Sequence, residues 1–497
     1  MQPATYGVRA ASGAAWSIVS AVVSKLAGLG SQLVLGWLLS KEDFGVYALA
    51  ISTAWVAGIF ADGGTRKILL QQGERYAELA RPAFKLSLAI NATAAVILAM
   101  AAPAIASLYR TPELTLLLWI ICGSMILTTF GAVQRIRLLI DLRFRASSML
   151  VAGSAILRQV CTVVLALLGF GPLSFVLPLL LVATFEAVVG RMIVGPLPRG
   201  NELDWQLTKY LLGQSPWLII SALALALSFQ GDYLVVGAMQ TPAVLGAYFF
   251  AFQLTYALTT PLGTAIRSVL LPSFARLKDD TARQAKAFSK SARIAVVMLS
   301  LAAAFLVVLA EPLIHLLWAG KWDDATLGVQ ALGVGLPFRL LAPISISLVE
   351  SRGHWRAAAF LTAFAAVGTL GAAALGASLG GATSIAICIS VQQVVVGVVQ
   401  SVFAARVVGL GALRFVATLG LPMVLASGAA SLTLWLMSVL ACSVHVRLIV
   451  APLLLAVALC VVARLVIWQQ VKECATFVAS MRGRRGKSVP ETDRSLS

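Results

Sequence analysis

Apolar segments long enough to cross a membrane recur from residue 14 to residue 468, and no sizeable polar block separates them. A transmembrane helix needs roughly 20 mostly apolar residues to cross a hydrocarbon layer of about 30 Å. Because 60% of the 497 residues are apolar and only 12% are charged, no soluble fold can hide this much apolar surface. The sequence therefore predicts an all-α polytopic membrane protein with about fourteen transmembrane helices.

Polar residues, or glycine and proline clusters, separate the predicted spans. The first span is longer and begins later than the apolar region of a cleavable signal peptide, and no small-residue cleavage site follows it. We place the spans at residues 14–39, 44–65, 83–108, 114–134, 149–169, 173–195, 213–238, 243–268, 294–318, 325–349, 356–378, 381–404, 415–440 and 446–468.

Lysine and arginine collect in alternate loops between these spans. Cytoplasmic loops of membrane proteins carry an excess of both residues, so the pattern predicts orientation. Most of the 38 basic residues lie in the loops that follow even-numbered spans or at the two termini. Only Lys41, Arg110, Lys321 and Arg447 fall on the opposite, external side. Both termini are therefore expected in the cytoplasm, with 471–497 as a basic cytoplasmic tail.

Signals for chemistry are absent from the sequence. The six cysteines have no metal-ligand spacing, so neither a metal site nor a cofactor is predicted. The net charge of +18 does not lie on an aromatic-interleaved face, which argues against nucleic acid as a partner. No nucleophile elbow or nucleotide fold occurs, so an enzyme is not expected. Four tryptophans near predicted membrane interfaces are interpreted as anchors in the aromatic belt: Trp16, Trp37, Trp217 and Trp318.

The first part of the chain repeats after a shift of 201 residues. The shift pairs Trp16 with Trp217, Gly45 with Gly246, Tyr47 with Tyr248 and Arg66 with Arg267, without a gap. It corresponds to six helices, an even number, so the two copies have the same orientation. An axis along the membrane normal then relates two six-helix lobes, an architecture typical of alternating-access transporters.

The repeat divides the chain into four parts. The predicted N-terminal six-helix lobe is 1–200 and the C-terminal six-helix lobe is 201–410. Two further helices occupy 411–470, and the basic tail is 471–497.

A few charges remain inside the predicted spans, where a charge near the bilayer centre costs about 3 kcal/mol or more. One interpretation is internal pairing, for instance of Arg158 with Glu186 on the neighbouring helix, or snorkelling of long side chains to the headgroups. The other is a hydrated cavity that receives an anion, because cations outnumber carboxylates there. A pyrophosphate would suit such a site, since arginine binds phosphate oxygens through planar paired donors. The candidate cations are Lys25, Arg66, Arg158, Arg267 and Arg339, and the acidic groups are Asp62, Glu186 and Asp232.

The segment LLSKEDFGVYALA at 38–50 and the turn from Asp62 to Gly64 before Arg66 resemble the Wzx-type polysaccharide flippases. These belong to the multidrug/oligosaccharidyl-lipid/polysaccharide exporter superfamily. The second lobe is similar to them at Asp232-Tyr233, at LGAYFFA from 245 to 251, and from Arg267 to Pro272.

This resemblance implies a flippase that moves an undecaprenyl-pyrophosphate-linked oligosaccharide from the cytoplasmic to the periplasmic leaflet of a bacterial inner membrane. Lys25 and Arg267 lie in helices where such flippases place cavity cations. Two energy sources are alternatives. One is an H⁺ or Na⁺ gradient, coupled through Asp62, Glu186 or Asp232, and the other is the membrane potential. Expected partners are membrane lipids, a polysaccharide polymerase and glycosyltransferases.

Two alternatives come from the same superfamily: a lipid II flippase for peptidoglycan, and an ion-coupled multidrug antiporter. The antiporter would need acidic groups lining its cavity. An alternative from another class is an O-antigen polymerase. Members of that family have a long external catalytic loop, which this chain lacks.

Overall fold

The computed structural model describes residues 3–58, 69, 75–196, 216–256, 259–440 and 444–465. These residues form fifteen α-helices and one short 3-10 helix, and no strand occurs among them. Eleven of the described helices are long and apolar enough to cross a membrane. The all-α polytopic fold is thus confirmed, and each predicted span corresponds to described helical residues.

The predicted span 243–268 includes residues 257 and 258, which lie outside the described residues, so it is described as two helical segments. These are α10 (Pro242–Tyr256) and α11 (Thr259–Arg276).

The chain divides into two compact units. Unit 1 consists of Met1–Gln253, Leu317–Gly328 and Ala359–Ile389, and unit 2 of Leu254–Leu316, Val329–Ala358 and Ser390–Ser497. Unit 1 therefore holds parts of both predicted lobes. The boundaries after residues 200 and 410 were predicted from the internal repeat, and they stay a prediction.

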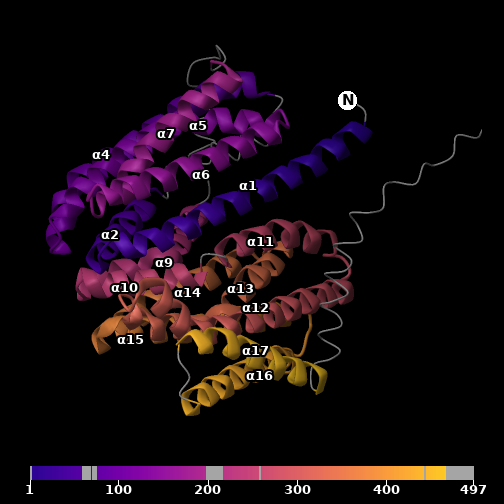
Figure 1. The fold of residues 1–497 in the computed structure, drawn as a ribbon. Helices are drawn as coiled ribbons and strands as arrows, with labels where there is room; N and C mark the ends of the chain where they lie inside the picture. The colour runs from indigo at the N-terminus through magenta and orange to yellow at the C-terminus, as the bar shows by residue number, and fades with distance from the viewer. Residues whose placement is uncertain are drawn as a thin grey trace, which may run out of the picture. The chain divides into compact units, whose positions relative to one another are not determined.

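Unit 1 contains an N-terminal bundle in which α5 packs on α4 and α7, and α6 packs on α1 and α7, as Figure 1 shows. From the second repeat, α9 packs against α2. The helices with most of their residues in unit 1 are α1 (Pro3–Leu38), α2 (Lys41–Ala57), α4 (Tyr76–Leu108), α5 (Glu113–Ile140), α6 (Phe144–Leu167), α7 (Leu173–Val194), α9 (Pro216–Met239), α10, and α14 (Trp355–Leu379).

Unit 2 has a core of small and branched side chains, in which Ala304 and Val308 meet Ala430 and Leu455. The short side chains of this core let the helices approach closely, as is usual inside membranes. Its helices are α11, α12 (Thr281–Trp318), α13 (Thr326–Ser351), α16 (Ala412–Val439) and α17 (Val444–Leu465), with α15 (Gly381–Val407) divided between the units.

Large apolar side chains cover the outside of both units. Met100, Met192 and Val424 are 79%, 80% and 69% exposed. Exposed apolar surface on this scale is unfavourable in water but suits contact with lipid tails. Together with the apolar helices, it marks a multi-pass membrane protein.

Candidate functional site

The two repeats meet where α2 crosses α10. A Cβ atom built on Gly45 would collide with the backbone carbonyl of Pro242, and one built on Gly246 would collide with that of Lys41. The shift of 201 residues maps each of these pairs onto the other, so the crossing obeys the symmetry of the repeat. Only glycine permits this backbone approach. The repeated glycines thus bring the corresponding segments of the two repeats into direct contact.

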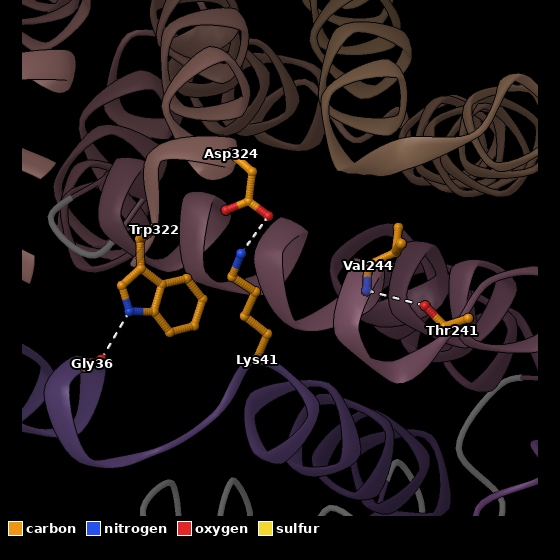
Figure 2. Close-up of polar contacts among 6 residues, drawn as sticks. All are labelled: Gly36, Lys41, Thr241, Val244, Trp322 and Asp324. Carbon is orange, nitrogen blue, oxygen red and sulfur yellow. Dashed lines mark hydrogen bonds and ion pairs between the residues drawn. The ribbon is translucent and has the colours of Figure 1, made fainter. Parts of the chain in front are cut away.

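Both helices begin at this crossing with equivalent caps. Ser40 Oγ accepts a hydrogen bond from Asp43 N at 3.1 Å, and Asp43 Oδ2 accepts one from Ser40 N at 2.8 Å, forming a capping box. In α10, Thr241 Oγ1 accepts from Val244 N at 3.5 Å (Figure 2). The matching caps fix where each helix starts and therefore bring the two glycines to the same level.

The end of α1 is held by residues of the second repeat that lie at the end of α12 and directly after it. Trp318 and Trp322 donate from their indole nitrogens to the carbonyls of Leu33 and Gly36, at 3.0 and 2.9 Å. Lys321 Nζ donates to the carbonyls of Trp37 and Leu39, at 2.9 and 2.7 Å. The last carbonyls of a helix lack intrahelical donors and carry partial negative charge, so a lysine there is favourable.

An ion pair lies beside these contacts. Lys41 Nζ lies 2.7 Å from Asp324 Oδ2. Figure 2 shows this ion pair near the hydrogen bond between Trp322 and Gly36. Burial lowers the pKa of Lys321, which lies outside the spans, whereas the nearby Asp43 carboxylate opposes that shift. We define the lobe clamp as Lys41, Trp318, Lys321, Trp322 and Asp324. Sequence reasoning missed it, although repeated glycines and two isolated external lysines were the available signal.

Aromatic rings pack against the two tryptophans of the lobe clamp. Phe250 stacks on Trp322 with 3.9 Å between ring centroids, and Phe44 meets Trp322 edge-on at 5.2 Å. Trp318 is 1% exposed and also contacts Phe250, at 5.0 Å. The expectation that Trp318 is a lipid-facing belt anchor was therefore wrong, because its ring is buried between segments of the two repeats.

Arg158 is held by a tyrosine of the repeated segment. Its Nη2 donates to Tyr47 Oη at 3.1 Å, and no carboxylate forms an ion pair with it within the described residues. Glu186 lies instead 3.6 Å from Arg135 Nη1, so the alternative pairing of Arg158 with Glu186 was wrong. This contact with a neutral hydroxyl fixes the guanidinium without neutralising its charge.

The equivalent tyrosine of the second repeat holds a carboxylate. Tyr248 Oη donates to Asp232 Oδ2 at 2.6 Å, and Asp232 is 2% exposed. The two repeats thus use the same tyrosine position for opposite charges, Arg158 in the first and Asp232 in the second.

Arg267 is paired. Both carboxylate oxygens of Glu350 accept from its Nη2, each at 2.7 Å, and the Glu350 side chain is only 11% exposed. Sequence reasoning missed Glu350 because it lies at the end of a predicted span and 83 residues away. The pair is a charge-assisted contact within unit 2.

Arg339 lies against an aromatic face. Its Cζ is 4.4 Å from the centroid of Tyr256, a cation–π distance. The Tyr256 hydroxyl is buried and donates to Gln393 Oε1 at 2.6 Å. The ring is therefore fixed, and it positions the guanidinium within the predicted span.

The remaining candidates are less defined. Lys25 lies in the middle of α1 and is half-buried. Asp62 and Arg66 lie outside the described residues. Among described residues, no group of three histidine, cysteine, aspartate or glutamate side chains is placed to hold a metal ion. Charge pairs and aromatic contacts make up the described part of the arrangement.

A model of the family described as "Polysaccharide biosynthesis protein" matches residues 34–327, which include the α2–α10 crossing and the lobe clamp. The chain belongs to this family. The resemblance to Wzx-type flippases of the exporter superfamily is thereby confirmed, together with the association with polysaccharide biosynthesis and transport.

Two family relatives match most of the chain. The succinoglycan biosynthesis transport protein ExoT of Rhizobium meliloti is 29% identical, covering 72% of this chain and 73% of that protein. The lipopolysaccharide biosynthesis protein WzxC of Escherichia coli is 23% identical, covering 65% of this chain and 66% of that protein.

The fold is similar to a solved structure of the lipid II flippase MurJ in an inward closed conformation. The TM-score is 0.69 at 12% identity, covering 91% of this chain and 99% of that chain. At this identity the likeness concerns the fold, which is that of a multi-helix membrane transporter.

Proposed function

We propose that this family member is a flippase that moves an undecaprenyl-pyrophosphate-linked oligosaccharide from the cytoplasmic to the periplasmic leaflet of a bacterial inner membrane, for surface polysaccharide biosynthesis. The observation that carries the proposal is the symmetric α2–α10 crossing. It joins two parallel repeats at the end predicted to be external, whereas candidate anion-binding cations occupy spans of both repeats.

Transport proceeds by alternating access between the two lobes. With the α2–α10 crossing and the lobe clamp formed, the external end is closed and the lipid-linked substrate enters from the cytoplasmic leaflet. Separating Gly45 from Gly246 and Trp322 from α1 opens the external end. Because packed interfaces have discrete arrangements, a closed interface of this kind switches between two states.

The pyrophosphate is bound by cations of the spans. Arg158 donates to the Tyr47 hydroxyl and Arg339 lies over the Tyr256 ring, and a guanidinium that is already positioned binds phosphate oxygens with less loss of side-chain entropy. Lys25, from α1, supplies a mobile charge. Arg66 completes the set as the repeat partner of Arg267.

Arg267 joins the site by exchanging partners. Glu350 occupies its Nη2 in this state, so an incoming phosphate must displace a carboxylate. The exchange replaces one charge-assisted contact with another and therefore costs little net free energy. It gives the substrate differential affinity for two arrangements, which is the condition for driving a conformational change.

Ion coupling falls to the acidic groups. Asp232, buried and bound by Tyr248, is the candidate for binding a proton or sodium ion. Glu186, paired with Arg135, and Asp62 are further candidates. The membrane potential acting on the anionic headgroup is the other energy source. A polysaccharide polymerase and glycosyltransferases are the proposed partners, and both chain termini are proposed to be cytoplasmic.

The test uses the full chain reconstituted in liposomes with a fluorescent undecaprenyl-pyrophosphate oligosaccharide, scored by its appearance in the opposite leaflet. Lys25→Gln and Arg158→Gln are expected to reduce transport at least tenfold with insertion unchanged. Arg283→Gln is the matched control, because Arg283 is 76% exposed beside Asp280. Wild-type transport by both site variants would overturn the anion site.

Substrate choice is tested in the same liposomes. Faster movement of lipid II than of the oligosaccharide lipid would replace the proposal with the peptidoglycan flippase. Proton-driven export of cationic drugs without lipid movement would replace it with the antiporter.

A further inference from the structure

A buried glutamine joins the ends of three helices in unit 2. Gln284 lies in the first turn of α12 and is 0% exposed. Its Nε2 donates to the carbonyl of Phe274, in the last turn of α11, at 2.9 Å. The same nitrogen donates to Ser351 Oγ, at the end of α13, at 3.2 Å. One side chain thus bridges α11, α12 and α13.

An arginine completes the hydrogen bonding of this glutamine. Arg352 Nε donates to Gln284 Oε1 at 2.6 Å, and Arg352 Nη2 donates to Thr281 Oγ1 at 2.9 Å. A guanidinium nitrogen only donates and a backbone carbonyl only accepts, so the neighbours fix which way the Gln284 amide points. Hydrogen bonds are directional, whereas apolar contacts are not. The bonds of Gln284 therefore define the positions of the three helix ends narrowly.

The glutamine contacts both helices that carry the Arg267–Glu350 pair. On α13, Ser351 directly follows Glu350 in the chain. On α11, Phe274 lies two helical turns after Arg267, a rise of about 10 Å. The Glu350 side chain is only 11% exposed, so the position of the end of α13 decides how its carboxylate meets Arg267.

The two helices depend on Gln284 to different extents. α11 is also held by the Phe274 ring, which meets the Phe288 ring of α12 edge-on with 6.4 Å between centroids. Both rings are buried, and their packing does not need the glutamine. Loss of the Gln284 side chain should therefore displace the end of α13, and with it Glu350, more than it displaces α11.

We propose that Gln284 is a positioning residue that keeps Glu350 opposite Arg267 and thereby sets the affinity of the site for the pyrophosphate lipid. The inference rests on the proposed function, in which phosphate displaces Glu350 from Arg267. Loosening the end of α13 weakens the competing carboxylate, while Arg267, 44% exposed, stays available to the substrate. Removing Gln284 should thus tighten substrate binding, whereas a folding defect would weaken it.

The experiment titrates the reconstituted full chain with the fluorescent undecaprenyl-pyrophosphate oligosaccharide. Gln284→Leu is expected to lower the Kd about two- to fivefold, a range typical of coupling between residues of one network. Arg352→Lys keeps the charge but loses the planar fork that reaches two acceptors, and it is expected to lower the Kd by a smaller factor. This milder variant keeps the test decisive if Gln284→Leu fails to insert.

A second glutamine provides the matched control. Gln330 Nε2 donates to the carbonyl of Val307 at 3.0 Å, so it also joins α13 to α12. It lies 20 residues before Glu350 on the same helix, a distance of about 30 Å along α13. Gln330→Leu is expected to bind the lipid as wild type does, and equal tightening there would overturn the proposal.

A double variant separates positioning from a general structural role. In the Glu350→Gln background, Gln284→Leu should add no further tightening, because the competing carboxylate is already gone. Tightening that persists in this background would overturn the proposal, as would a lower maximal rate with no fall in Kd. If Glu350→Gln lowers the Kd but Gln284→Leu and Arg352→Lys do not, the inference alone fails. If Glu350→Gln itself leaves the Kd unchanged, the partner exchange in the proposed function is overturned, and the inference with it.

Discussion

Gly45 and Gly246 lie in contact, one from each repeat, and a Cβ atom on Gly246 would stand 3.0 Å from the backbone nitrogen of Gly45. A side chain at either position collides with backbone of the other repeat, and backbone cannot move aside as a flexible side chain can. The close contact of the two repeats at this crossing therefore requires glycine at both positions.

Gly45→Ala is expected to shift the protein toward the externally open state. Overpacking of this kind costs typically about 1–3 kcal/mol, which corresponds to roughly a 5- to 150-fold change in population. The measurement is labelling of a cysteine introduced at Phe44, a residue of the aromatic cluster, by an impermeant thiol reagent. Gly371→Ala is the control, since nothing lies within 4 Å of its Cβ position. Equal labelling in the two variants would contradict the steric role of Gly45.

The lobe clamp is expected to draw its stability from packing more than from its ion pair. Lys41 and Asp324 are 29% and 51% exposed, and such pairs contribute about 0.2–1 kcal/mol. Trp322 is fully buried, and burying a large aromatic side chain contributes about 1.5–3 kcal/mol. Asp324→Asn should thus increase labelling at residue 44 by less than fivefold, and Trp322→Ala by more than tenfold. The opposite ranking would mean that charge, not packing, holds the lobes together.

Glu350→Gln is expected to tighten binding of the pyrophosphate lipid, because it removes the competitor for Arg267 without removing the arginine. Arg267 is 44% exposed, so solvent screens the pair, and the expected gain is modest, about three- to tenfold in Kd. Arg267→Gln should weaken binding. Titration of the reconstituted protein with the fluorescent lipid measures both. Glu78→Gln, which breaks the exposed pair with Arg75, serves as control, and tighter binding there would indicate a general charge effect.

Tyr47→Phe is expected to weaken pyrophosphate binding about tenfold, since the lost hydroxyl leaves the Arg158 guanidinium without its positioning contact. Transport at saturating substrate should change less, because the charge itself remains. Initial transport rates over a range of lipid concentrations separate these effects. Tyr109→Phe is the matched control, because it removes a tyrosine hydroxyl at the end of α4. A uniform loss of maximal rate in Tyr47→Phe would point to a structural role instead.

The spans could be predicted because each run of apolar residues is long enough on its own to specify a membrane helix. The contact between the two repeats could be predicted only in part from the sequence. Repeated glycines at 45 and 246 predicted equivalence, yet nothing in the order of residues shows that they touch. Glu350 was missed for a related reason, since an ion pair between α11 and α13 depends on how the helices pack.

Asp232 and Tyr248 offer the sharpest test of ion coupling. A buried carboxylate is costly in its charged form unless it is hydrogen-bonded, and Tyr248 supplies one such bond from the neighbouring helix. A group of this kind can exchange a proton when the lobes move and its surroundings become wet. Asp232→Asn keeps the shape but cannot titrate, so transport should continue down a substrate gradient while losing its response to an imposed proton gradient. Tyr248→Phe, which leaves the carboxylate in place, should retain that response with an altered pH optimum. Asp280→Asn, at an exposed position beside Arg283, is the control for removal of a charge. A full response to the proton gradient in Asp232→Asn would assign coupling to another carboxylate or to the membrane potential acting on the anionic substrate.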